Sequence, residues 1–371
     1  MQREALVLRA QHDPMPGIAH PGPHQTYRRP RIAIERGAMP SLEHGDVRLE
    51  MLYAGLCGTD LHLIDAHPAT GYIRTSSPVH VPESGRIFGH EGIGRVVESG
   101  PGARRLPPGA IVAIESIIAC GSCDACLRGF PNQCHHSRLI GLERDGLFAT
   151  VADVPASVLH DVSAFIGSDD DMRALACLEP AGVALVACRN GRMAAGENLV
   201  IFGAGPIGLC CAMLAREVFD AGCVHIVEPV PFRRQLAAQW ANVVCGPEEF
   251  EAQSPGGIDV AIETSGCMGN VAHALPGMNA HGRIVVLARS GEPLTLPSID
   301  CMITNAVSIV GSRGHLGAFG TLLEWYARGR FQPGRIVTRV ADGLGEFAGL
   351  LAHPADIPDR EGKVLVKISR S

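Results

Sequence analysis

Positive charge is scarce in this 371-residue sequence, in which 32 Lys and Arg face 38 Asp and Glu for a net charge of -6. Lys363 and Lys367 are the only lysines, so arginine supplies nearly all of the positive charge. Without a basic excess, the chain is unsuited to neutralising a phosphate backbone, and we expect neither nucleic acid nor membrane as a partner. A composition of 46% hydrophobic and 19% charged residues predicts two compact domains and excludes intrinsic disorder.

Long hydrophobic runs are also absent. The most apolar stretch, residues 199–215, is too short to span a membrane and is interrupted by three glycines and a proline. The N-terminus has no apolar signal-peptide region, and the 13 cysteines are an odd number, which argues against a secreted disulfide framework. We therefore expect a cytoplasmic protein in which clustered cysteines bind metal or take part in chemistry.

The sequence changes character along its length. Proline and glycine crowd the first forty residues, which predicts a loop with little regular structure. Short apolar runs from residue 47 to about 165 predict mainly antiparallel strands. From residue 196 to about 314, β-branched apolar runs alternate with helical patterns, which predicts a doubly wound parallel sheet. The final strand, GKVLVKI, is expected to rejoin the first domain.

A glycine-rich turn, GAGPIG, follows one of the predicted buried strands and opens a helix. The first glycine permits a tight turn, the second lets the backbone approach a pyrophosphate, and the third lets helix and strand pack closely. The context predicts a dinucleotide site, the alternative being a turn without a ligand. The predicted cofactor-binding residues of the turn are Gly203, Gly205, Pro206, Ile207 and Gly208.

An acidic residue, Glu228, ends the next predicted strand, twenty residues after Gly208. A carboxylate there can accept hydrogen bonds from the adenosine ribose hydroxyls and would repel a 2′-phosphate, so NAD is favoured over NADP. Arg233 is a further predicted cofactor-binding residue. Arg233 or Arg234 could still reach a 2′-phosphate if the carboxylate turned away.

Four cysteines fall within fifteen residues as C-x2-C-x2-C-x7-C: Cys120, Cys123, Cys126 and Cys134. Four thiolates this close suit a closed tetrahedral zinc site, and an iron–sulfur cluster is the competing interpretation. A closed site leaves no position for a substrate. Its predicted role is structural, in folding a lobe with little core of its own.

A second metal site is suggested by Cys57, His90 and Glu179, which lie in three distant segments. One thiolate, one imidazole and one carboxylate would leave an open coordination position, as catalytic zinc requires. Their spacing alone does not assemble such a site, because a single buried Cys or His is more often a core residue.

The segments CGTDLH, GHEGIGRVVESG, CGSCDACLRGFPNQC, LEPAGVAL and VIFGAGPIG resemble, in order and rough spacing, those of the zinc-dependent medium-chain dehydrogenase/reductase family. That family includes alcohol, polyol, sugar and threonine dehydrogenases. The resemblance runs from residue 47 to the last strand. It implies a GroES-like catalytic domain at 1–184 with a zinc lobe at about 118–136, a Rossmann NAD-binding domain at 185–314 and a C-terminal return at 315–371. A cleft active site and a homodimer or homotetramer are also implied.

The resemblance carries roles to individual residues. Cys57, His90 and Glu179 correspond to catalytic zinc ligands, with Cys177 as a second candidate near Glu179. Glu91 corresponds to an alternate ligand or a carboxylate beside the metal.

Three further residues are implied in catalysis. Asp60 is similar to the residue that orients the zinc-bound imidazole. Thr59 and His62 resemble the hydroxyl and imidazole that pass the substrate proton to solvent.

The implied enzyme holds two zinc ions per chain and uses NAD to interconvert a secondary alcohol of a polyol, sugar, cyclitol or amino alcohol with its ketone. Alternatives are a biosynthetic ketone or aldehyde reductase using NAD(P)H, and a catalytically silent nucleotide-binding relative. Residues 66–87 form a longer segment than the family has, and either contact the hydroxylated substrate or form a solvated loop. The candidates in it are Tyr72, Arg74, His80 and Arg86.

Overall fold

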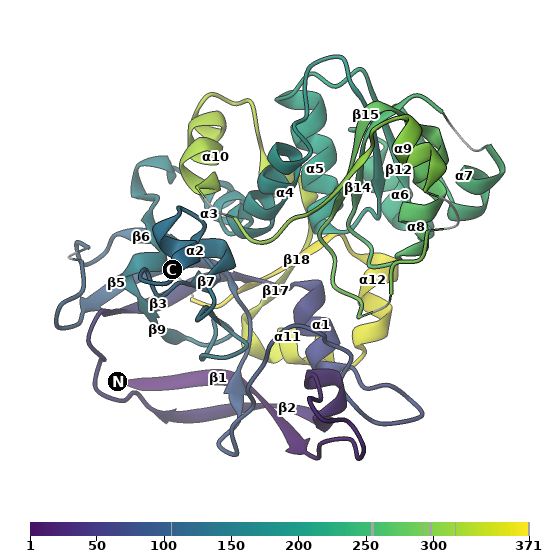
Figure 1. Cartoon of the computed structure of the whole chain (residues 1–371). Helices are drawn as coiled ribbons and strands as arrows, with labels where there is room; N and C mark the ends of the chain where they lie inside the picture. Colours follow the sequence, from purple (N-terminus) through teal and green to yellow (C-terminus); the bar gives the residue numbers. More distant parts are fainter. Residues whose placement is uncertain (105, 254–255, 292, 297–298, 316, 370–371) are drawn as a thin grey trace. The chain divides into compact units, whose positions relative to one another are not determined.

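The computed structural model describes the chain except for residues 105, 254–255, 292, 297–298, 316 and 370–371 (Figure 1). The chain forms two compact units, which are described separately. The first unit comprises Met1–Glu179, Val337–Ile357 and Lys363–Ser371, and the second comprises Pro180–Ile336 and Pro358–Gly362. Residues 315–336, which we expected in the returning segment, lie in the second unit.

The first forty residues form a long β-hairpin, so the prediction of a loop was wrong. Strands β1 (Gln2–His12) and β2 (Tyr27–Ala38) pair antiparallel, and β4 (Arg86–Ile87) pairs with the other edge of β1. The prolines at 14, 16, 21 and 23 all lie between the two long strands. Pro30 lies in β2, an edge strand, where a missing N–H is tolerated.

The main sheet of the first unit has seven strands in the order β10-β6-β5-β3-β18-β17, with β9 also paired to β3. All pairings are antiparallel except that between β17 and β18. Nine of the ten residues of β3 are buried, so it forms the centre of this unit. The strands are β3 (Asp46–Gly55), β5 (Glu91–Ser99), β6 (Ile111–Ile114), β9 (Val151–Pro155), β10 (Leu159–Asp161), β17 (Val337–Asp342) and β18 (Lys363–Lys367).

Short helices and a small two-stranded sheet complete the first unit. Helix α11 buries Leu344, Phe347 and Leu351, and the Phe347 ring lies 4.7 Å from that of Phe148. The elements are α1 (Gly58–Ile64), α2 (Asp124–Leu127), α3 (Asp169–Leu175), α11 (Gly343–Leu351), β7 (Ile117–Ile118) and β8 (Arg138–Leu139).

The second unit contains a six-stranded, all-parallel sheet in the order β13-β12-β11-β14-β15-β16. The chain starts at β11 and builds outwards first on one side and then on the other, as in a Rossmann fold. This confirms the predicted doubly wound sheet. Its strands are β11 (Asn198–Phe202), β12 (Cys223–Val227), β13 (Val243–Cys245), β14 (Ile258–Glu263), β15 (Met278–Val286) and β16 (Ser308–Gly311).

Helices connect these strands (Figure 1). Residues 208–215 of α5 are all buried, as expected for a helix covering a parallel sheet. The connecting helices are α5 (Pro206–Glu217), α6 (Pro231–Ala237), α7 (Pro247–Gln253), α8 (Gly269–Ala274) and α9 (Asp300–Thr304). Helix α4 (Leu178–Asn190) precedes β11, whereas α10 (Ala318–Ala327) and α12 (Ile357–Arg360) follow β16; α4 and α12 both start in the first unit.

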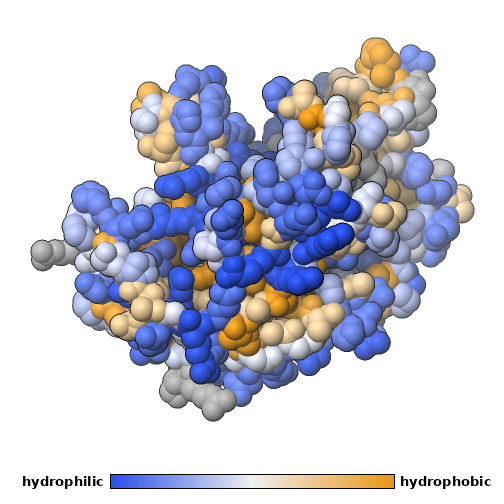
Figure 2. Space-filling view, turned by 90° about the horizontal axis from the view of Figure 1, so that it is seen from below, coloured by the Kyte–Doolittle hydropathy of each residue, from blue (hydrophilic) through white to orange (hydrophobic). Residues whose placement is uncertain are grey.

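Among the described residues, no helix is long and apolar enough to cross a membrane. On the face seen in Figure 2, hydrophobic residues occur in small groups among hydrophilic ones.

Candidate functional site

Cys57 lies between the central strand β3 and helix α1. It is the residue before α1, and its extended backbone turns the chain from strand to helix. Its N–H donates to Asp60 Oδ2 at 3.0 Å. Burial raises the pKa of the Cys57 thiol, and the nearby charge of Glu91 adds to this effect. A metal cation is the kind of partner that would keep such a sulfur as thiolate.

His90 and Glu91 lie at the start of β5. They follow Gly89, a position that only glycine can occupy. Gly89 has a φ of +88°, and a Cβ there would lie 2.7 Å from the Phe148 ring. Asp60 joins this segment to α1, because its Oδ1 accepts from the Gly89 N–H at 3.2 Å. The same oxygen lies 3.5 Å from His90 Nδ1.

Ligand atoms of Cys57, His90 and Glu91 all lie within 4.8 Å of one another. His90 Nδ1 is buried without a hydrogen-bond partner, and His90 Nε2 lies 4.0 Å from Glu91 Oε1. Sulfur, imidazole nitrogen and carboxylate oxygen are the donors that zinc prefers. The first unit therefore holds a Cys/His/Glu zinc site, and its residues fit the ion.

Glu179, the carboxylate that the family resemblance favours as ligand, does not belong to this group. It lies in the first turn of α4, is buried, and accepts a hydrogen bond from Ser116 Oγ at 2.8 Å. Cys177 is also outside the group; burial raises the pKa of its thiol to about 12, so it is a neutral thiol near pH 7. Of the two neighbouring carboxylates, Glu91 is the one that the fold brings to Cys57 and His90.

Lys363 is the functional-site neighbour that sequence reasoning missed. It is fully buried at the start of β18 and forms an ion pair with Glu91 Oε2. It is separated from Glu91 by 272 positions, so no local motif joins them. The sequence feature that could have drawn attention to it is that Lys363, one of only two lysines, begins an apolar strand.

Thr59 and His62 lie three positions apart on α1, a spacing that places side chains on one helix face. The side chain of His62 is exposed, and desolvation by the protein atoms around its ring, together with the charge of Arg74, lowers its pKa. A lowered pKa keeps the imidazole neutral near pH 7, the form that can accept a proton.

The segment 66–87 contains one candidate beside His62. The Arg74 N–H donates to the His62 carbonyl at 3.0 Å, and the Arg74 side chain lies 3.2 Å from Asp65 Oδ2.

The other candidates make structural contacts. Arg86 is buried and donates to Asp145 Oδ1 and to the His80 carbonyl. Tyr72 donates to the Asp13 carbonyl at 2.9 Å. The side chain of His80 is exposed.

The four-cysteine lobe forms a second metal group, with ligand atoms of Cys120, Cys123, Cys126 and Cys134 within 4.8 Å of one another. Neighbouring sulfurs are 3.5 to 4.0 Å apart, and all four cysteines are free thiols. Backbone N–H groups of Ser122 and Cys123 point at Cys120 Sγ, and hydrogen bonding lowers the pKa of this thiol to about 5. The lobe is thus a closed structural zinc site.

In the second unit, the GAGPIG turn joins β11 to α5 with the expected steric demands. Gly203 has a φ of +96°, and a Cβ on Gly208 would lie 2.0 Å from the Gly203 carbonyl oxygen. Gly205 precedes α5, and Pro206 occupies the first turn, where its missing N–H costs no hydrogen bond.

The acid of the dinucleotide site, Glu228, is buried and fixed by backbone groups. Its Oε2 accepts from the Ala204 N–H at 2.6 Å and its Oε1 from the Val230 N–H at 2.9 Å. Arg234 donates to the carbonyls of Glu228 and Pro229.

Arg233 lies next to the glycine turn. Its Nη1 would be 4.0 Å from a Cβ on Gly205, and its Nε donates to the Glu361 carbonyl at 3.4 Å. A cation in this position can contact a pyrophosphate on the turn.

Comparison with known proteins matches two parts of the chain to two families. Residues 43–164 match the alcohol dehydrogenase GroES-like domain family, and residues 206–328 match the zinc-binding dehydrogenase family. The chain is 31% identical over 320 residues to L-threonine 3-dehydrogenase of Pyrococcus horikoshii, covering 83% of this chain and 88% of that protein. It is 30% identical over 320 residues to scyllo-inosose 3-dehydrogenase of Thermotoga maritima, covering 79% of each.

Among solved structures, the alcohol dehydrogenase rspB from E. coli CFT073, complexed with NADH, superposes with a TM-score of 0.81 at 21% identity over 99% of both chains. That likeness extends the fold to the whole chain. Together with the two metal groups and the glycine turn, these matches identify the chain as a zinc-dependent NAD(P) dehydrogenase acting on an alcohol or polyol, a member of the zinc-dependent medium-chain dehydrogenase family.

Proposed function

We propose that this enzyme uses NAD to interconvert a secondary alcohol of a polyol, sugar, cyclitol or amino alcohol with its ketone. The observation that carries the proposal is the convergence of Cys57, His90 and Glu91 on one point. Relatives that act on threonine and on scyllo-inosose support a secondary hydroxyl as the reacting group. When bound, zinc supplies a Lewis acid for the substrate oxygen, and NAD supplies the hydride acceptor.

The chain's own residues would hold the metal and move the proton. Cys57, His90 and Glu91 hold the ion, and Asp60 fixes the two segments that carry them. Glu179 stays a predicted ligand, although its carboxylate lies outside the Cys57, His90 and Glu91 group and accepts a hydrogen bond from Ser116 Oγ.

Thr59 Oγ1 would accept the hydroxyl proton and pass it towards His62 and solvent. His62 must be neutral to take it. The hydroxyl proton would thus leave to water, and the hydrogen on the carbinol carbon is the one that NAD would accept when bound.

Replacing Arg74 with alanine is expected to move the acidic limb of the pH profile of kcat/KM to higher pH. Arg74 lowers the pKa of His62, so its removal raises that pKa, and protonated His62 cannot accept a proton. Alcohol oxidation measured against pH checks this. Arg86→Ala is the matched control, since Asp145 and the His80 carbonyl hold that guanidinium. Identical acidic limbs for wild type and Arg74→Ala would remove His62 from the proton path.

Replacing Glu228 with alanine is expected to shift the ratio of kcat/KM for NAD over NADP towards NADP by roughly a hundred-fold. The change removes both a ribose acceptor and a charge that repels a 2′-phosphate, together worth about 2–3 kcal/mol. The assay is cofactor reduction over polyols, aldoses, cyclitols and amino alcohols with each cofactor. Arg233→Ala is the contrast, because a pyrophosphate contact is common to both cofactors and should weaken both equally. An unchanged ratio in Glu228→Ala would contradict the assignment of NAD.

A further inference from the structure

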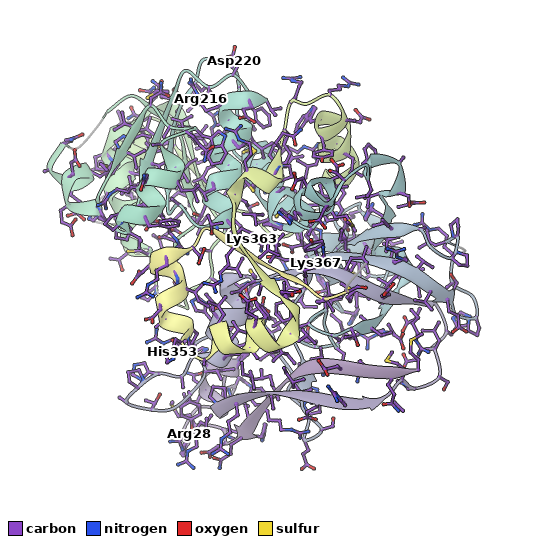
Figure 3. The ribbon with its side chains drawn as sticks, turned by 180° about the vertical axis from the view of Figure 1, so that it is seen from behind. Arg28, Arg216, Asp220, His353, Lys363 and Lys367 are labelled. Atoms are coloured by element: carbon purple, nitrogen blue, oxygen red, sulfur yellow. The ribbon has the colours of Figure 1, made fainter. Side chains whose placement is uncertain are left out.

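Among the residues of the first unit that the structure describes, Lys363 is the most deeply buried cation, with no exposed surface. Figure 3 shows it on β18 together with Lys367, the only other lysine of the chain. Burying an ammonium group costs several kcal/mol unless a partner and hydrogen bonds compensate it. An apolar side chain would fill a strand interior at lower cost, so this position calls for a charge.

The contacts of Lys363 all lead to the metal group. Its Nζ donates to the Leu56 carbonyl at 2.9 Å and pairs with Glu91 Oε2. Leu56 immediately precedes Cys57. A Cβ on Gly55 would lie 2.8 Å from Glu91 Oε2 and 2.9 Å from Lys363 Cε, so the missing side chain provides the space for this pair.

The carboxylate of Glu91 lies among groups that act on its charge in opposite directions. Burial and the neighbouring Glu179 raise the pKa of the Glu91 carboxyl, whereas Lys363 lowers it. Burial acts to lower the pKa of Lys363, and the neighbouring charge of Glu91 offsets this by raising it. The pair holds one oxygen of Glu91, Oε2. The other, Oε1, is the oxygen 4.0 Å from His90 Nε2.

We propose that Lys363 is a positioning residue for the catalytic zinc, which takes up Oε2 of Glu91 and leaves Oε1 alone to the metal. A carboxylate restricted to one oxygen keeps a coordination position open for the substrate. The proposal rests on the proposed function only in that Cys57, His90 and Glu91 hold the ion. Neither substrate identity nor cofactor choice enters it.

The test replaces Lys363 with methionine, which removes the charge and keeps the length of the side chain. Glu91 can then offer both of its oxygens to the ion. We expect zinc release from the catalytic site into a chromogenic chelator to slow by roughly tenfold, the scale on which partners of metal ligands act. We also expect weaker visible absorption of the cobalt-substituted protein, as for a higher coordination number. Release from the catalytic site is the phase that Cys57→Ala lacks.

Two further variants make the result decisive. Lys367→Met is the matched control, since that lysine pairs with Asp169, and should release zinc as wild type does. Glu91→Gln with Lys363→Met should match Glu91→Gln alone, because Lys363 acts only through Glu91. Unchanged zinc release and cobalt spectrum in Lys363→Met would overturn the proposal.

If Lys363→Met does not fold, the proposal is tested by comparing Glu91→Gln with the variant that carries both Glu91→Gln and Lys363→Met. Any difference between the cobalt spectra of these two proteins overturns the proposal. Wild-type protein with only one zinc per chain would instead overturn the metal site of the proposed function.

Discussion

Replacing Cys57 with alanine is expected to lower the zinc content from two ions per chain to one and kcat/KM for alcohol oxidation roughly a thousand-fold. Cys57 supplies the only sulfur of the Cys/His/Glu group, and the remaining imidazole and carboxylate bind zinc weakly. Loss of a Lewis acid at the substrate oxygen removes several kcal/mol of transition-state stabilisation, and each 1.4 kcal/mol is about tenfold in rate. Metal analysis and steady-state kinetics check both parts.

Cys177→Ala is the matched control for this experiment. Its thiol is buried and neutral and lies outside the metal group, so both zinc ions should remain. Equal zinc loss in the two variants would mean that Cys177 is a ligand and that the Cys57 group is incomplete. Retention of two zinc ions by Cys57→Ala would remove Cys57 from the site altogether.

Replacing Cys134 with serine is expected to remove the other zinc ion and to unfold the lobe between β7 and β8. Cys134 is the one buried cysteine of the four, and its Sγ accepts from the Cys120 and His136 N–H groups at 3.3 Å. Helix α2 has four residues, none of them buried, so the lobe has little core without metal. Structural zinc contributes about 10–16 kcal/mol in small zinc-binding peptides, far more than this lobe's side chains can.

Limited trypsin digestion measures the unfolding of the lobe. Arg128 and Arg138 are exposed within it, and cleavage there should be fast in Cys134→Ser and slow in wild type. Cys267→Ser, an exposed cysteine of the second unit, is the control. A Cys134→Ser protein with two zinc ions and wild-type digestion would show that the lobe does not depend on this ligand.

The two metal groups differ in how far sequence could predict them, because their ligands differ in separation. The four cysteines lie within fifteen residues, so their spacing alone predicts a common ion. Cys57 and His90 are brought together by Asp60, which hydrogen-bonds both segments, and no pattern in the sequence carries that contact. The choice between Glu91 and Glu179 likewise depends on where β5 and α4 begin. The ion pair that fixes Glu91 comes from the last strand of the chain.

The parallel sheet was predictable for a different reason. A strand buried on both faces is a nearly continuous apolar run, as β11 is after its first residue, Asn198. This pattern can be recognised in the sequence without knowing which strands lie beside it. The N-terminal hairpin was not predicted, because the proline-rich connection dominates the composition of the first forty residues and conceals the two strands on either side of it. Partly buried and exposed positions alternate along β2 in the structure, but its residue types, YRRPRIAIERGA, do not alternate between apolar and polar, so the sequence gives little signal for this strand.

The most direct test of the whole account is transfer of hydrogen from the carbinol carbon to NAD. The zinc-loaded enzyme would be given NAD and a polyol or amino alcohol carrying deuterium on its secondary carbinol carbon, with mass spectrometry of the reduced cofactor as readout. The account predicts one deuterium per reduced nicotinamide in wild type and almost no reduction in Cys57→Ala. Reduced cofactor without deuterium, or equal reduction by the two proteins, would contradict direct hydride transfer at this zinc site.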